Sequence, residues 1–170
     1  MSNTAGVNKG QLIASMRHEA EIIKHLKTCI PEGAYEYVPG PEQRSMRELL
    51  GYLSVAALSP CIYAVNGNWD HAADLYGSAN NLDLAGYDAA MDHQISAIEE
   101  TLAAVSDEDL ATRQITMPWG TPCTLGEGLL NMGVKTLTAY RMQLFLYIKA
   151  AGNKDIGSYE CWAGGAPPQG

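Results

Sequence analysis

The segment VKTLTAYRMQLF, Val134 to Phe145, lies inside the longest helical pattern of the chain, which begins at Thr124 and ends near Gly152. At 1.5 Å per residue such a helix is roughly 42 Å long, enough to run the length of one domain. Its apolar positions recur every three or four residues, as on the buried face of an amphipathic helix. The residues assigned to this face are Leu125, Leu129, Met132, Thr136, Gln143 and Tyr147, with Tyr140 at its edge.

Three residues of this predicted buried face are polar: Thr136, Tyr140 and Gln143. A polar group buried without a hydrogen-bond partner costs about 1–3 kcal/mol, so their presence needs a reason. Thr136 and Tyr140 are four residues apart, the spacing at which two side chains on successive helical turns can hold one metal ion. The pattern therefore marks this part of the helix as a candidate site.

Three further helical patterns precede this one, and no period-2 strand pattern competes with them. The first runs from Leu12 to Ile30, and the third has apolar residues at heptad positions from Leu84 to Val105. The second begins with Ser45 and Glu48, whose side chains can form a capping box. Four amphipathic helices predict an all-α fold, a four-helix bundle, with residues 1–170 forming a single domain.

The second helical pattern has two unusual features. Pro60 should bend the helix, because proline lacks the N–H that would donate to the preceding turn. A second stripe on the same helix predicts a contact with a further surface, and it consists of Tyr52, Ala56, Ser59 and Tyr63. The apolar excess of the second and fourth helices predicts a homodimer that pairs through them.

The segment SDEDLATRQITMPWGTPC, residues 106–123, contains two prolines and a glycine and is expected to be an ordered, non-helical crossing. Trp119 in this segment is either a packing anchor or part of a ligand clamp near one end of the bundle. The tail YECWAGGAPPQG is not expected to extend a helix, although Trp162 can anchor it to the domain.

The amino-acid composition excludes several kinds of partner and site for this protein. The chain has 170 residues, 46% of them hydrophobic, and a formal net charge of −8 without a basic cluster. Nucleic acid and anionic membranes are therefore poor partners. The N-terminal MSNTAGVNKG lacks a basic start followed by an apolar run, and no uninterrupted apolar span is evident, so we expect a soluble cytoplasmic protein. The four cysteines form no CxxC pair, which excludes the usual zinc and redox motifs.

The order of MRELLGYL, MPWGTPCTLGEGLLNM, AYRMQLFLYIKAAG and CWAGG along the whole chain resembles the DinB-like superfamily of bacterial four-helix bundles, which have a long crossover connection. The resemblance implies a metal site with three histidines. Carried over position by position, these ligands fall at Tyr52, Thr136 and Tyr140, none of which is histidine. Neutral hydroxyls are poor ligands for Zn²⁺ or Ni²⁺, so no metal or other cofactor is expected.

Two interpretations of these positions remain open. Tyr52, Thr136, Tyr140, Gln143 and Trp119 either line a metal-free pocket for a small organic ligand or form a self-satisfied polar cluster in a former metal site. The first predicts a small-molecule-binding protein, and the second predicts a structural homodimer. The resemblance also implies an enzymatic alternative, a metal-dependent thiol transferase or hydrolase with relocated ligands such as His71 or acidic groups. The sequence alone does not decide whether the protein is an enzyme.

Overall fold

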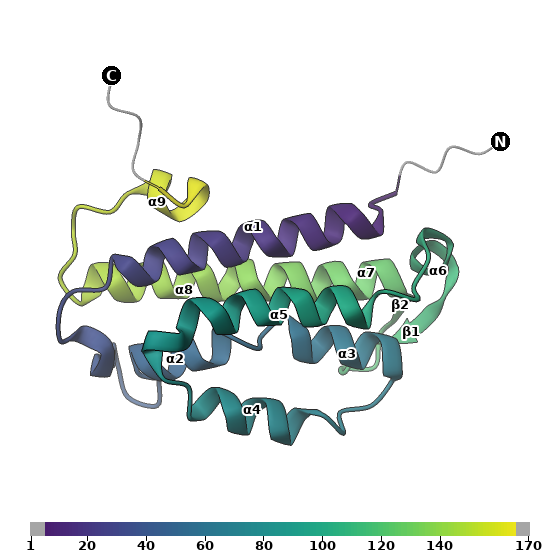
Figure 1. Cartoon of the computed structure of the whole chain (residues 1–170), viewed down its shortest axis with the longest axis horizontal. Coiled ribbons are helices and arrows are strands. Elements are labelled where there is room, and N and C mark those ends of the chain that lie inside the picture. The colour runs from purple at the N-terminus through teal and green to yellow at the C-terminus, as the bar shows by residue number, and fades with distance from the viewer. Residues whose placement is uncertain (1–5, 166–170) are drawn as a thin grey trace.

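The computed structural model describes residues 6–165, which are predominantly helical with one short two-stranded sheet (Figure 1). The all-α prediction is confirmed at this level, while residues 1–5 and 166–170 of the predicted 1–170 domain lie outside the described range. The elements are α1 (Lys9–Thr28), η1 (Ala34–Glu36), α2 (Met46–Leu53), α3 (Leu58–Asn66), α4 (Ala72–Asn80), η2 (Leu84–Gly86), α5 (Tyr87–Thr101), α6 (Asp107–Thr112), β1 (Gln114–Thr116), β2 (Pro122–Thr124), α7 (Leu125–Leu129), η3 (Leu130–Val134), α8 (Lys135–Ala150) and α9 (Ser158–Ala163).

The helices enclose one apolar core. Helix α1 packs against α5 and α8, α2 packs against α8, and α3 packs against α5 and α7. Figure 1 shows α7 and α8 as one continuous rod that runs beside α1. The most deeply buried side chains come from all of these helices and include Met16, Ile23, Leu26, Leu49, Leu53, Met91, Ile98, Leu129, Leu137, Leu144 and Ile148.

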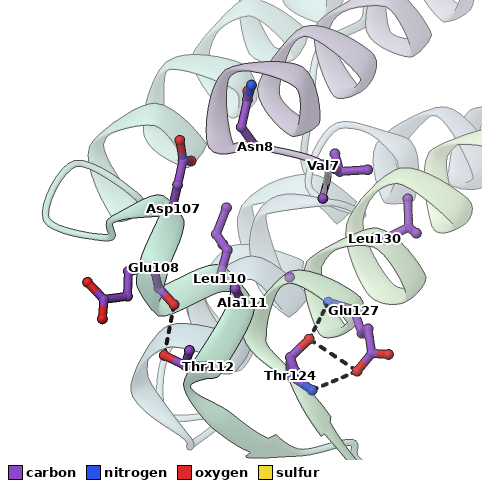
Figure 2. Close-up of a pocket in the computed structure, with 12 residues that line it drawn as sticks. Val7, Asn8, Asp107, Glu108, Leu110, Ala111, Thr112, Thr124, Glu127 and Leu130 are labelled. Atoms are coloured by element: carbon purple, nitrogen blue, oxygen red, sulfur yellow. Dashed lines mark hydrogen bonds between the residues drawn. The ribbon is translucent and has the colours of Figure 1, made fainter. Parts of the chain in front are cut away.

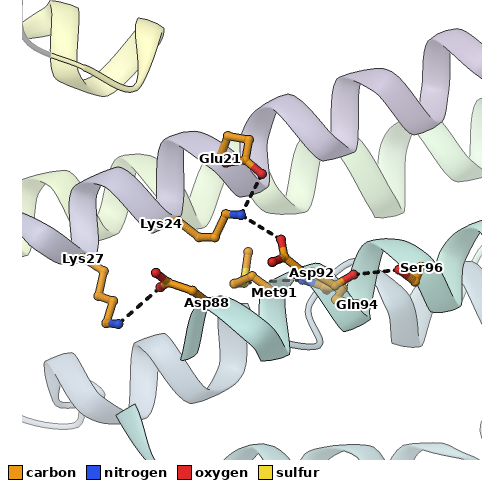
Figure 3. A network of polar contacts seen from close by, with 8 residues as sticks. All are labelled: Glu21, Lys24, Lys27, Asp88, Met91, Asp92, Gln94 and Ser96. Carbon is orange, nitrogen blue, oxygen red and sulfur yellow. Dashed lines mark hydrogen bonds and ion pairs between the residues drawn. The ribbon is translucent and has the colours of Figure 1, made fainter. Parts of the chain in front are cut away.

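Ion pairs set the alignment of α1 and α5. Lys24 lies 2.7 Å from Asp92, and Lys27 lies 3.2 Å from Asp88 (Figure 3). The partner number falls as the α1 number rises, so the two helices are antiparallel. The acidic partners are exposed to solvent, and such pairs each contribute only about 0.2–1 kcal/mol. The pairs therefore favour one register, while the apolar core supplies most of the stability.

The second predicted helix is interrupted a few residues before Pro60, so the structure contains two helices in its place. Helix α2 ends at Leu53 and α3 begins at Leu58, so Pro60 lies in the first turn of α3, where its missing N–H costs little. The side chain of Gln94 from α5, only 1% exposed, satisfies the backbone at the break. Its Oε1 accepts from the N–H groups of Ala57 (2.9 Å) and Leu58 (3.3 Å), and its Nε2 donates to Leu53 O (3.0 Å). The predicted bend is thus a complete break.

The fourth predicted helix contains a π-helical turn, η3, between α7 and α8. A π turn places one more residue in the turn than an α-helix does, so every later residue shifts by one position on the helix surface. The predicted buried face is confirmed at Leu125, Leu129, Met132 and Tyr147. Beyond η3 the assignment of Thr136 and Gln143 to that face is wrong, because the fully buried positions are one residue later, at Leu137, Arg141, Leu144 and Ile148.

Helix α4 covers the outer face of α2. A Cβ atom on Gly51 would lie 2.6 Å from Ala79 O, so only glycine lets the two helices approach this closely. The approach brings Tyr76 of α4 parallel to Tyr52 of α2, with ring centroids 6.0 Å apart. Tyr63 Oη also donates to Thr116 O at 2.8 Å. The second stripe predicted for this part of the chain, which lies on α2 and α3, therefore contacts α4 and the β1–β2 hairpin of the same chain.

Two predictions about irregular segments are wrong in part. Residues 106–123 contain α6, capped by Ser106, and most of the β1–β2 hairpin, because the Ser106 side chain accepts from Asp109 N–H and starts a helix. The tail forms α9, although Trp162 does contact the domain through Arg141.

The Met46–Asn66 segment is long and apolar enough to span a membrane, but 67% of its most apolar window is buried, as in a core helix of a soluble protein.

Candidate functional site

Four of the five predicted site residues come together on one side of the molecule. Tyr52 of α2, Thr136 of α8 and Trp119 of the β1–β2 turn line the same hollow, whose volume is about 180 Å³. The ring of Tyr140 lies 4.7 Å from that of Tyr52, at an interplanar angle of 58°. Gln143 is separate, since its Nε2 donates to Tyr147 Oη at 2.8 Å. The one-residue shift at η3 places Thr136 and Tyr140 at the half-buried margin of the core.

The 180 Å³ hollow has mainly aromatic walls. Trp69 stacks on Tyr63 with centroids 4.4 Å apart, and it lines the hollow together with Trp119. Both indoles are unusually open to solvent, at 40% for Trp69 and 66% for Trp119. The other lining residues are Tyr52, Ala56, Pro60, Tyr76, Pro118, Asn131, Met132 and Thr136. Such walls suit a flat apolar group.

A second hollow of about 350 Å³ adjoins the first, because Tyr52 and Tyr76 line both. Its other lining residues are Arg44, Glu48, Ala79 and Asn80. The Arg44 guanidinium lies over the Tyr52 ring, with Cζ 4.4 Å from the centroid, and 6.0 Å from that of Tyr140. We call the two hollows together the aromatic cleft. Its charged groups lie at the Arg44 end, and its indoles lie at the other end.

The phenol of Tyr52 is protonated under ordinary conditions. Burial raises its pKa above the usual value for tyrosine, and the neighbouring phenols of Tyr140 and Tyr76 raise it further. A group whose pKa is raised in this way loses its proton only in strong alkali. Tyr52 therefore presents a neutral hydroxyl to the aromatic cleft.

The residues at the expected metal positions do not fit a transition metal. Tyr52 is neutral, and Thr136 offers an alcohol, whereas Zn²⁺ and Ni²⁺ favour imidazole, thiolate and carboxylate. Within residues 6–165 no group of three or more His, Cys, Asp or Glu side chains is placed to hold a metal ion. His71, the suggested relocated ligand, instead bonds through Nε2 to Ser59 O at 2.9 Å.

The predicted polar cluster is satisfied only in part: the phenols of Tyr52 and Tyr140 are within hydrogen-bonding reach of each other, and Gln143 donates to Tyr147. Across the part of the chain that the structure describes, the Thr136 hydroxyl has no hydrogen-bond partner, whereas Thr138 on the same helix donates to Val134 O at 3.0 Å. Thr136 lines the hollow and is only half-buried, so its hydroxyl is accessible. It is therefore available to water or to a ligand.

Another hollow, of about 700 Å³, lies where α1, α6 and α7 begin (Figure 2). The N-termini of these helices are already capped by Asn8, Ser106 and Thr124. Its charged lining residues, Asp107, Glu108 and Glu127, are all acidic. Helix N-termini attract anions, but these are occupied and surrounded by negative charge. This hollow therefore has weaker features of a binding site than the aromatic cleft.

The cleft residues that the sequence did not point to include Arg44, Trp69 and Tyr76. A signal for Arg44 was present, because Arg44, Glu48 and Tyr52 are spaced four residues apart and share one helical face. No comparable signal marks Tyr76, whose place depends on how α4 packs on α2.

Comparison with known proteins does not identify a family for this chain. Neither the protein-family models nor the curated proteins match this chain. The functional argument therefore depends on the aromatic cleft itself.

Proposed function

We propose that this protein is a metal-independent binding protein for a small organic ligand, and that the aromatic cleft is its site. The observation that carries the proposal is that Tyr52 and Tyr76 line both hollows, so an indole-lined hollow and a hollow with charged groups lie on either side of the same two rings. Ligand sites are typically concave and mostly apolar, with a few polar groups that fix orientation. The exposed indoles, which do not contribute to the core, support the same assignment.

The proposal includes a DinB-like four-helix bundle in a cytoplasmic protein. The four helices would be α1, α2 with α3, α5, and the rod formed by α7, η3 and α8. Their mutual contacts support this arrangement, and the connection through α4 would be the long crossover. The metal-dependent transferase or hydrolase is the less favoured alternative, because residues 6–165 bring no ligand set together.

Binding should depend on the indole end of the aromatic cleft. Planar fragments that bind the wild-type chain, detected by ligand-observed NMR in the presence of EDTA, should bind Trp119→Ala about tenfold more weakly, a loss of ~1.4 kcal/mol. Trp162→Ala is the matched control, because Trp162 is also exposed, at 60%, but lies on α9 outside the cleft. Fragments that bind both variants equally, or that need a metal ion, would contradict the proposal.

We also propose the homodimer, for which the remaining support is the exposed apolar surface of α8. Leu146 is 56% exposed, whereas the second stripe of α2 and α3 is used within the chain. Sedimentation should show a dimer at micromolar concentration, and Leu146→Glu should convert it to a monomer of 18.3 kDa. Leu130→Glu, at a partly exposed site in η3, should leave the dimer intact. A monomeric wild-type chain would refute the dimer.

A further inference from the structure

Arg44 has no polar partner in the described chain. Every other arginine has one: Arg17 pairs with Glu99, Arg47 with Glu36, Arg141 with Glu19, and Arg113 donates to Val65 O. Within residues 6–165 the Arg44 guanidinium makes no ion pair and no hydrogen bond, only its contacts with the rings of Tyr52 and Tyr140. Arg44 is exposed to solvent, so its guanidinium can be reached by a ligand in the hollow that it lines.

The contact with Tyr52 places the guanidinium in the cleft without using its hydrogen-bonding capacity. A cation over an aromatic ring is held by the ring quadrupole, so the N–H donors of Arg44 remain available. Tyr76 and Asn80 line the same hollow, and neither side chain has a hydrogen-bond partner among residues 6–165. The polar end of the cleft therefore combines the guanidinium of Arg44 and the carboxylate of Glu48 with the neutral polar groups of Tyr76 and Asn80.

Glu48, the acidic residue of this hollow, is already engaged. Its Oε2 accepts from the Ser45 N–H at 2.6 Å in the capping box of α2. This backbone hydrogen bond lowers the pKa of Glu48 below its usual value, so the carboxylate remains charged and bound to the helix terminus. A cationic ligand would compete with Arg44 for the Tyr52 face and would be repelled by it. Because the Glu48 carboxylate is hydrogen-bonded to the helix terminus and makes no hydrogen bond to Arg44, the N–H donors of Arg44 remain free to bind a ligand carboxylate.

We propose that the ligand is a small aromatic carboxylic acid. This inference rests on the proposed function, because it names the ligand class of the same cleft. Arg44 would bind the carboxylate through two N–H donors, the geometry for which a guanidinium is suited. The flat apolar part would lie toward Trp69 and Trp119 in the adjoining hollow. A monoanion matches the single unpaired guanidinium, whereas a phosphate dianion would leave one charge uncompensated.

Three matched probes test the charge requirement: 3-phenylpropionate, 3-phenylpropionamide and 3-phenylpropylamine. Isothermal titration should show that the wild-type chain binds the acid at least about tenfold more tightly than the amide or amine. Arg44→Gln should bring the affinity for the acid down to that for the amide. Arg17→Gln is the control, because Arg17 is an exposed arginine on α1 that does not line the cleft.

The outcomes separate the inference from the proposed function. If acid and amide bind equally and both lose affinity in Trp119→Ala, the carboxylate inference is overturned and the cleft stays a binding site. If the amine binds most tightly, the inference is also overturned. If no probe binds, or if binding is insensitive to both Trp119→Ala and Arg44→Gln, the inference and the proposed function both fail.

Discussion

Replacing Arg141 by alanine should destabilise the protein by about 3–5 kcal/mol, because the change leaves a charge buried without its partner. Arg141 is 0% exposed, and its Nε lies 3.0 Å from Glu19 Oε2, on a side chain only 12% exposed. It also donates through Nη1 to Cys161 O and lies under the Trp162 ring, with Cζ 4.6 Å from the centroid. One side chain thus joins α8, α1 and α9.

Chemical unfolding in urea measures this effect, with Arg17→Ala as the matched control. Arg17 also pairs with a glutamate, Glu99, but both side chains are exposed, at 53% and 44%, so its loss should cost less than about 1 kcal/mol. A double variant, Glu19→Leu with Arg141→Met, should recover much of the loss, because it removes both buried charges. If Arg141→Ala unfolds at the same urea concentration as Arg17→Ala, the buried pair contributes little to the native state.

Replacing Gln94 by leucine should destabilise the protein by about 3 kcal/mol or more, although leucine is similar in size and more apolar. The loss arises from the backbone at the break between α2 and α3, where Gln94 bonds to Ala57 N, Leu58 N and Leu53 O. Each of these groups would become buried without a partner, at about 1–3 kcal/mol apiece. Apolar burial by leucine offsets only part of this cost.

The same substitution at Gln143 provides the control. Gln143 is half-buried on α8 and donates one hydrogen bond, to Tyr147 Oη, so Gln143→Leu should cost no more than about 1 kcal/mol. Thermal unfolding should separate the two variants by several degrees. Equal melting temperatures would mean that the break does not depend on the Gln94 side chain.

Local signals in the sequence were sufficient for the helix starts. The capping box predicted at Ser45 with Glu48 is present with reciprocal hydrogen bonds, and the helix expected to begin at Thr124 starts with a second capping box, formed by Thr124 and Glu127. These motifs are predictable because all their partners lie within three residues. The disruption near Pro60 was predictable for a similar reason, since it follows from the proline ring itself. The sequence analysis also placed Tyr52, Thr136 and Trp119 at one candidate pocket, and these three residues line one hollow.

Only the tertiary structure decided which polar side chains are buried. Helical periodicity assumes a constant rotation per residue, and η3 breaks that assumption, so Arg141 enters the core where Thr136 and Gln143 were expected. Gln94 is buried because a break in another helix needs its amide, a requirement created by residues nearly 40 positions away. Each of these placements depends on a partner that is distant in the sequence. Periodicity along one helix reports the direction of a side chain, whereas the free energy of burying its polar atoms is set by the groups that tertiary packing brings to it.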